Sequence, residues 1–154
     1  MELEDIFRAH QKEIFMYLLR TVGDRRLAED LAQDTFLRAC GSAVLFRGEA
    51  SPRTWLFSIA RRALADHYRR RSPDVLLGEG PDLPARIPDT AERIAVEQAL
   101  RVMPLLQREA VVLCDVLGFS PAEAAEMTGV SANAFRVRLH RARARFREVY
   151  GGDR

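Results

Sequence analysis

Residues 131–147, SANAFRVRLHRARARFR, combine an apolar helical stripe with a dense row of arginines. At about 100° per residue on a helix, four apolar side chains fall within one narrow stripe: Phe135, Leu139, Ala142 and Phe146. Six arginines and no acidic residue lie between Arg136 and Arg147. Because like charges one turn apart repel each other, a helix face of arginines alone indicates an anionic partner. The planar guanidinium group suits both phosphates and the edges of guanine.

The residues before this stretch predict a helix-turn-helix. Residues 120–123, SPAE, form a capping box with proline at the first helical position, and they open a short helix over Pro121–Thr128. Gly129 supplies a left-handed turn residue, and Ser131 caps the basic helix. This order of elements is typical of DNA-binding helix-turn-helix units. The arginine face favours that interpretation over a plain helical hairpin or a basic helix exposed to solvent.

The composition is that of a globular, helix-rich protein, with 47% hydrophobic and 30% charged residues in a chain of 154. The net charge is +2, but charge is unevenly distributed along the chain, since residues 72–93 carry two basic and five acidic side chains. No apolar run approaches the roughly 18 residues that a membrane span requires, and the first residues do not resemble a signal peptide. We therefore expect a cytoplasmic protein without membrane insertion.

The residue types that usually carry catalysis or bind metals are scattered. Cys40 and Cys114 lie far apart, with no histidine at ligand spacing, so we expect two buried thiols and no metal site. The three histidines, His10, His67 and His140, belong to no catalytic arrangement, and no glycine-rich loop is placed to cradle a phosphate. These patterns disfavour an enzyme, and we expect neither a cofactor nor a small-molecule substrate.

A proline-rich acidic segment divides the chain. Four of the seven prolines lie close together in this segment, at Pro73, Pro81, Pro84 and Pro88. Such a segment favours a flexible or extended linker over residues 72–91, between an N-terminal domain at 1–71 and a C-terminal domain at 92–151. We expect this linker to act as a tether.

Hydrophobic periodicity predicts an all-α fold of two small helical domains. The N-terminal domain is expected to be a three-helix bundle and the C-terminal domain a four-helix unit that ends in the helix-turn-helix. The expected helices before that motif are Leu3–Val22, Arg25–Ala39, Pro52–Arg71, Ala91–Val102 and Leu105–Leu117. Asp24 and Ser51 are the expected caps of the second and third helices.

Residues 46–71 interleave aromatic and basic side chains. They include Phe46, Arg47, Arg53, Trp55, Arg61, Arg62 and Tyr68. Single-stranded DNA needs stacking faces beside cations, and this segment offers both. Trp55 and Phe57 are open to a second interpretation as core residues. Arg61 and Arg62 are expected on an exposed shoulder of the helix, where DNA is the favoured partner.

Two stretches together resemble the extracytoplasmic-function (ECF) sigma factors of bacterial RNA polymerase. Residues 28–39, AEDLAQDTFLRA, and 46–71 resemble the first conserved domain of the family. Residues 103–109, MPLLQRE, and 118–143 resemble the second. Asn133, Ala134 and Phe135 stand where Gly, Thr and Val are common in the family, which leaves the promoter sequence open. The resemblance implies an initiation factor that binds core polymerase, recognises promoters and promotes their melting.

The resemblance also implies which residues carry each role. Docking on the clamp helices of the largest polymerase subunit falls to Asp30, Gln33, Asp34 and, more weakly, Arg38. Capture of the −10 element as a single strand, with a flipped base, falls to Phe46, Arg47, Arg53, Arg61, Arg62 and Arg69. Binding of the −35 element falls to Arg136, Val137, Arg138, His140, Arg141, Arg143 and Arg145, of which Arg138, Arg143 and Arg145 are expected on phosphates. The flap of the second-largest subunit and an anti-sigma factor are the further partners that the resemblance implies.

A second interpretation is a helix-turn-helix repressor or activator that binds duplex DNA as a dimer. It leaves the acidic strip at 29–34 and the segment 46–71 without a role. It also requires a dimerisation helix, which the sequence does not contain in recognisable form.

Overall fold

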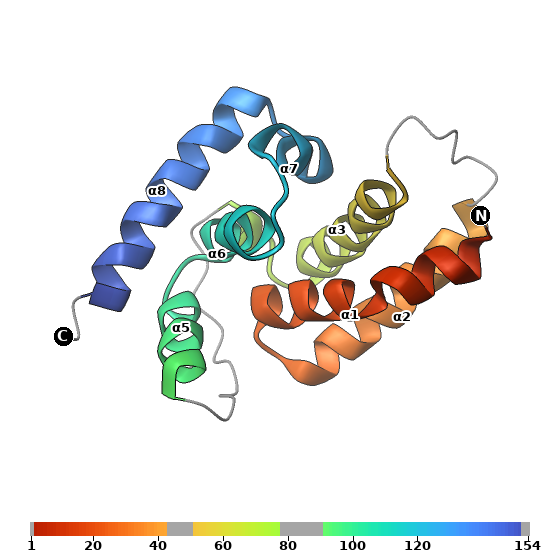
Figure 1. Cartoon of the computed structure of the whole chain (residues 1–154), viewed down its shortest axis with the longest axis horizontal. Helices are drawn as coiled ribbons and strands as arrows, with labels where there is room; N and C mark the ends of the chain where they lie inside the picture. The colour runs from red at the N-terminus through yellow and green to blue at the C-terminus, as the bar shows by residue number, and fades with distance from the viewer. Residues whose placement is uncertain (1, 43–50, 78–90, 152–154) are drawn as a thin grey trace.

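A computed structural model describes residues 2–42, 51–77 and 91–151, with side chains from residue 95 in the last range. Over these ranges the chain is helical and contains no strand. The elements are α1 (Leu3–Val22), α2 (Arg25–Ser42), α3 (Pro52–Arg71), α4 (Pro73–Leu76), α5 (Ala91–Arg101), α6 (Leu105–Val111), η2 (Val112–Val116), α7 (Pro121–Thr128) and α8 (Ala132–Gly151). The predicted all-α class is confirmed (Figure 1).

Helices α1, α2 and α3 form the N-terminal bundle, and local signals set their ends. Helix α1 ends at Gly23, whose left-handed backbone (φ 74°) directs its N–H to the carbonyl of Leu19. The predicted caps are present, since Asp24 accepts from the N–H of Leu27 and Ser51 from that of Thr54. Helix α2 runs to Ser42, three residues beyond the predicted end, and so includes Gly41.

The C-terminal half contains α5 to α8. The predicted single helix over Leu105–Leu117 begins as α6 and widens into a π-helical turn, η2. Gly118 follows with a positive φ of 79°, and the Phe119 N–H donates to the carbonyl of Leu113. This turn brings the Phe119 ring back against the core.

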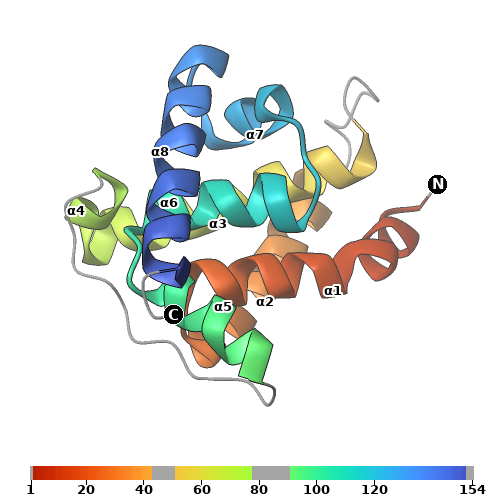
Figure 2. The same cartoon turned by 60° about the vertical axis from the view of Figure 1, so that its left-hand side comes forward.

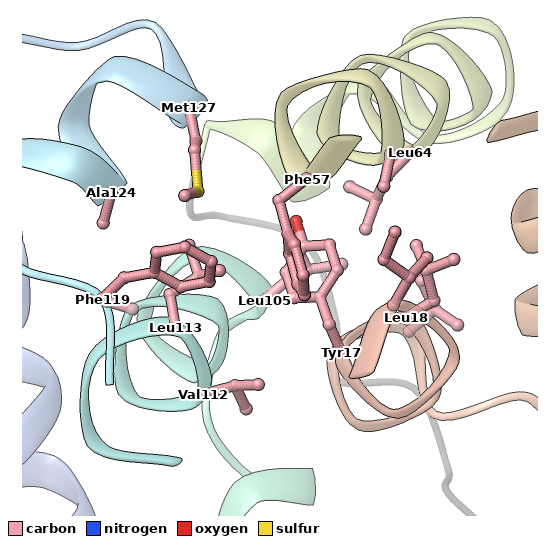
Figure 3. Packing of buried hydrophobic residues seen from close by; sticks show 14 of the residues in the cluster. Tyr17, Leu18, Phe57, Leu64, Leu105, Val112, Leu113, Phe119, Ala124 and Met127 are labelled. Carbon is pink, nitrogen blue, oxygen red and sulfur yellow. The ribbon is translucent and has the colours of Figure 1, made fainter. Parts of the chain in front are cut away.

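The two halves share one hydrophobic core. Helix α1 contacts α6, and α3 contacts α7, so that α6 and α7 lie between α8 and the N-terminal bundle (Figures 1 and 2). The Phe57 ring of α3 lies 5.6 Å from that of Tyr17 and 5.0 Å from that of Phe119, measured between centroids. Figure 3 shows these rings between α1, α3 and the α6–α7 segment. Phe57 is thus a core residue, and Trp55 packs partly buried beside the same core.

The expected linker begins with ordered residues. Helix α4 occupies residues 73–76, and its Val75 is buried in the shared core. Residues 78–90 lie outside the described residues. The chain between the two halves is therefore anchored at its first turn.

The capping box of α7 should contribute measurably to stability. Ser120 Oγ accepts from the Glu123 N–H at 3.1 Å, and Glu123 Oε1 accepts from the Ser120 N–H at 2.9 Å. Ser120→Ala should lower the free energy of unfolding by about 1 kcal/mol in urea denaturation, whereas Ser120→Thr should retain most of the cap. The Ser120 N–H also lowers the pKa of Glu123, so the Glu123 share of the stabilisation is lost on acidification below its ordinary pKa of 4.5. An unchanged denaturation midpoint for the alanine variant would contradict this role.

Candidate nucleic-acid interface

The turn between α7 and α8 positions the basic helix. Gly129 has a left-handed backbone (φ 75°), which glycine adopts without strain. Ser131 Oγ accepts a hydrogen bond from the Ala134 N–H at 3.0 Å and so caps α8. The buried side chains of α8 are Phe135, Leu139 and Ala142, and Phe146 is partly buried. The predicted turn, cap and apolar stripe are all present.

One face of α8 is open to solvent. Its exposed side chains include Arg136, Val137, His140, Arg141 and Arg145. Val137 exposes 44% of its surface, so its methyl groups are available for contact with a thymine methyl group. The face therefore combines hydrogen-bond donors with an apolar group, as readout of base edges in a major groove requires.

Two other arginines of α8 are held by the protein. Arg138 is half-buried and its Nη1 atom is fully buried, because position 138 lies one turn from Phe135, beside the apolar stripe. Arg138, which was expected on a phosphate, is therefore held partly inside the protein. Arg143 is exposed, but it donates two hydrogen bonds to Asp115, from Nη2 at 2.7 Å and Nε at 3.1 Å. A phosphate would have to compete with this carboxylate.

Two arginines of α3 point toward the C-terminal helices. The Arg61 side chain is only 11% exposed, and its Nε lies 2.7 Å from Oε2 of the buried Glu109. Arg53 donates to the carbonyl of Leu117 at 2.7 Å, with its guanidinium 4.0 Å from the Phe119 ring centroid. The prediction that Arg61 lies on an exposed shoulder is wrong, because the C-terminal half covers that shoulder.

The remaining basic residues of this segment differ in their surroundings. Arg62 is exposed and lines a hollow of about 430 Å³ with Arg38, Gly41, Ser42 and Ile59. Arg69 is exposed and donates to Asp66 Oδ1 at 2.7 Å. Phe46 and Arg47 lie outside the described residues. Of the expected single-strand residues on α3, Arg62 and Arg69 thus both reach solvent and border a hollow, and the hollow at Arg62 is the larger, since that at Arg69 measures about 220 Å³.

The acidic strip of α2 faces outward. Asp30 and Gln33 are exposed, whereas Asp34 accepts from Arg38 at 3.1 Å. Arg38 also donates to Asp66 of α3 at 2.8 Å, and this contact lowers the pKa of the Asp66 carboxyl. Arg38 consequently ties α2 to α3, while Asp30 and Gln33 are the members of the strip most accessible to a partner.

Two apolar grooves border these faces. The groove between α1 and α2 has a volume of about 450 Å³ and is lined by Phe7, Gln11, Lys12, Phe15, Ala32, Gln33 and Phe36. The groove between α5, η2 and α8 has a volume of about 320 Å³ and is lined by Val96, Leu100, Val111, Asp115, Val116, Arg143, Phe146 and Arg147. Both are suited to apolar side chains of a helical partner.

The buried carboxylate of Glu109, at the centre of the molecule, was not predicted from the sequence. Tyr17 donates a hydrogen bond from its hydroxyl to Glu109 Oε2 at 2.5 Å, across 92 positions of the chain. The available signal was the charged pair Arg108-Glu109 within an apolar stretch, since charged residues inside an apolar helix are buried only when they have partners.

The two cysteines are more accessible than expected. Cys40 is exposed and Cys114 half-buried, so the prediction of two buried thiols is wrong. Cys40 is exposed because it follows Ala39, which takes the inward position on α2.

No group of three or more His, Cys, Asp or Glu residues in the described ranges is placed to hold a metal ion. None of the described helices is long and apolar enough to cross a membrane.

Comparisons with known proteins cover both halves of the chain. Residues 6–73 match Sigma-70 region 2, and residues 93–146 match Sigma-70 region 4. The ECF RNA polymerase sigma factor SigC of Mycobacterium tuberculosis is 36% identical over 151 residues, which cover 92% of this chain and 79% of that protein. The RNA polymerase sigma factor CarQ of Myxococcus xanthus is 37% identical over 158 residues, covering 96% and 88%.

Two solved structures have a similar arrangement of helices. The sigma factor RpoE from Bartonella quintana, in complex with the anti-sigma factor NepR, has a TM-score of 0.79 at 25% identity, over 98% of each chain. CnrH, in complex with the cytosolic domain of CnrY, has a TM-score of 0.73 at 26% identity, covering 99% of this chain and 89% of that one.

Proposed function

The chain belongs to the ECF sigma factors of RNA polymerase, and we propose that it acts through separate surfaces for core polymerase, the −35 element and the −10 element. The observation that carries this assignment is the exposed arginine face of α8, set on a capped helix-turn-helix, with the acidic strip of α2 exposed elsewhere on the same chain. The protein itself performs no chemistry in this proposal. It acts in the cytoplasm, where it would join the polymerase.

Core polymerase would dock on α2. Asp30 and Gln33 offer an exposed carboxylate and an amide, and Gln33 also borders the apolar groove between α1 and α2. An exposed carboxylate on α2, together with the apolar groove that Gln33 borders, suits a basic, amphipathic pair of helices, in keeping with the clamp helices of the largest subunit. Asp34 takes part in this surface, and Arg38 supports it by linking Asp34 to α3.

Duplex DNA of the −35 element would be read by α8. Arg136, Val137, His140 and Arg141 face the major groove in this proposal, and Arg145 contacts a phosphate. Arg143 joins them when a phosphate displaces Asp115. Arg138 serves the packing of the helix, because its guanidinium is half-buried.

The apolar groove between α5, η2 and α8 would bind the flap of the second-largest subunit. Phe146 and Val116 offer apolar contacts there, and Arg143 lies at the same groove. Apart from Arg143, its lining is separate from the residues of α8 that we assign to the −35 element. A polymerase element and the −35 duplex can therefore occupy α8 together.

The −10 element would bind as a single strand beside Arg62. The hollow that Arg62 lines has room for one flipped base, and the guanidinium can stack on it or pair with a phosphate. Arg69, together with Phe46 and Arg47, would extend this surface along the strand. Arg61 is available to it only after the C-terminal half moves away, and Arg53 must in addition leave Glu13 of α1, to which it donates two hydrogen bonds.

We expect Arg62→Ala to impair promoter melting and to spare duplex binding. The loss of one base–cation contact should reduce open-complex formation about tenfold or more. Permanganate footprinting of unpaired thymines reports melting, and a mobility-shift assay with polymerase holoenzyme reports duplex binding. Arg70→Ala, at an exposed position near the end of the same helix, is the matched control. Equal footprints for Arg62→Ala and the unaltered protein would remove Arg62 from the −10 surface.

The test of the overall function is transcription in vitro. Core polymerase with this protein should initiate from a defined set of genomic fragments, and core polymerase alone should not. An anti-sigma factor would be a further partner, as for RpoE, and its addition should suppress the same transcripts. Duplex binding without any effect on polymerase would instead favour an independent helix-turn-helix regulator.

A further inference from the structure

A buried carboxylate joins the two halves of the molecule. Glu109 of α6 is fully buried, and two side chains of the N-terminal bundle contact its Oε2 atom. The Tyr17 hydroxyl donates to it at 2.5 Å, and Arg61 Nε lies 2.7 Å away as an ion pair that is not aligned for a hydrogen bond. Burial opposes the charge of Arg61, but the Glu109 carboxylate still raises the pKa of its guanidinium above the ordinary value. The core between the halves therefore contains a charge pair supplied by both.

The same carboxylate has a second potential partner that is left unsatisfied. Glu109 Oε1 is buried without a hydrogen bond, and so is Nη1 of Arg138 on the neighbouring helix α8. Burial lowers the pKa of Arg138. The negative charge of Glu109 acts to raise that pKa, and the positive charge of Arg61 acts to lower it further. A buried donor and a buried acceptor of opposite charge lie on two helices that contact each other, and neither is hydrogen-bonded, which indicates that a second pairing is available.

With its two halves packed together, which we call the closed chain, the protein cannot bind both promoter elements at once. Elements centred at −10 and −35 lie about 25 base pairs apart, or about 85 Å along B-form DNA. A compact chain of this length has a radius of gyration of about 15 Å. The sigma-factor function proposed above, on which this inference rests, therefore requires the two halves to separate, and separation removes both Tyr17 and Arg61 from Glu109.

We infer that Glu109 is an exchangeable counter-ion, which pairs with Arg61 and Tyr17 in the closed chain and with Arg138 once the halves separate. The exchange gives the Glu109 carboxylate a charged partner in the open state, after Tyr17 and Arg61 have been removed from it. It also couples opening to the DNA-binding helix, because the new pair ties α6 to α8 within the C-terminal half. Glu109 and Arg138 are thus positioning residues for α8.

The exchange controls which surfaces are available. In the closed chain Asp30 and Gln33 are exposed, as are Arg136 and Arg141, so polymerase and duplex DNA can reach their sites. Arg61 is covered by the C-terminal half. The closed chain is therefore accessible to its first partners while part of its single-strand surface is hidden.

The test measures the distance between the halves in the full chain, without polymerase or DNA. Spin labels go on the native, exposed Cys40 of α2 and on Glu148→Cys, an exposed position of α8, in a Cys114→Ser background. The parent protein should give a narrow distance distribution. Arg61→Gln removes the partner in the closed state and should raise the ratio of open to closed molecules about tenfold or more. Arg138→Gln removes the partner in the open state and should lower that ratio.

Two further variants keep the result interpretable. Tyr17→Phe retains the core ring and removes one hydrogen bond to Glu109, so it should shift the ratio in the same direction as Arg61→Gln but less. Arg70→Gln alters an exposed residue whose described hydrogen bond is to the carbonyl of Asp66 in its own helix, and it should leave the distances unchanged. Circular dichroism verifies the helical content of each variant.

Opposite shifts for Arg61→Gln and Arg138→Gln support the exchange, whereas shifts in the same direction, or none, overturn it. If Arg61→Gln fails to fold, the signs of Tyr17→Phe and Arg138→Gln decide in the same way. Because the measurement contains no promoter and no polymerase, its outcome is independent of the transcription assay.

Discussion

The double variant Asp30→Arg, Gln33→Ala should lose about hundredfold or more of its affinity for core RNA polymerase. Both side chains are exposed on α2, on the face opposite the buried Ala28, Leu31 and Thr35. A new arginine would stand against the basic clamp helices that we expect there, and like charges across an interface cost several kcal/mol. Folding should be nearly unaffected, because exposed substitutions of this kind change stability by about 0.5 kcal/mol or less.

The matched control for this variant is Asp5→Arg. It makes the same change of charge at an exposed position of α1, where we assign no partner. Titration of labelled core polymerase gives the affinities, and thermal unfolding verifies the fold. Asp34 is left unchanged so that its ion pair with Arg38 survives. Equal affinities for the double variant and the control would place the docking surface elsewhere.

Arg136→Ala and Arg141→Ala should each weaken binding to the preferred −35 sequence by about 1–3 kcal/mol, which is roughly five- to 150-fold. Both guanidinium groups are exposed on the open face of α8, so each is free to form a bidentate contact with guanine. The loss should be large on the preferred sequence and small on others, because a contact to a base edge is the one removed. Selection from a library with a randomised −35 region should show relaxed preference at different positions for the two variants.

Arg145→Ala is the comparison for these variants. Arg145 is exposed on α8 and assigned to a phosphate, so its loss should weaken binding to all sequences alike. The salt dependence of binding should fall by about one counterion. If Arg136→Ala and Arg141→Ala behaved in the same way as Arg145→Ala, α8 would bind only the DNA backbone.

Local features of the sequence determined the helices and their order. Asp24, Ser51 and Ser120 were identified as caps from residue type alone, and each accepts the expected backbone hydrogen bond. Such signals depend on a few neighbouring residues, so they survive in any tertiary context. The reading face of α8 was predictable for the same reason, since helical periodicity separates Phe135 and Leu139 from Arg136 and Arg141.

Packing between the two halves was not predictable from these patterns. The proline-rich segment indicated a tether between independent domains, and nothing in it signals that Tyr17, Phe57 and Phe119 meet in one core. Apolar residues that face a second domain have the same helical spacing as those that face their own. The shared core accordingly became visible only in the assembled fold.

The partners of the charged residues were decided by tertiary structure. Arg61 and Arg62 are adjacent and identical in type, yet Arg61 pairs with the buried Glu109 while Arg62 faces solvent. The sequence determined that α3 carries a basic face. Which of its arginines stays free depends on where a distant carboxylate lies and how much water remains around the pair, because distance and local dielectric set the strength of a charge pair.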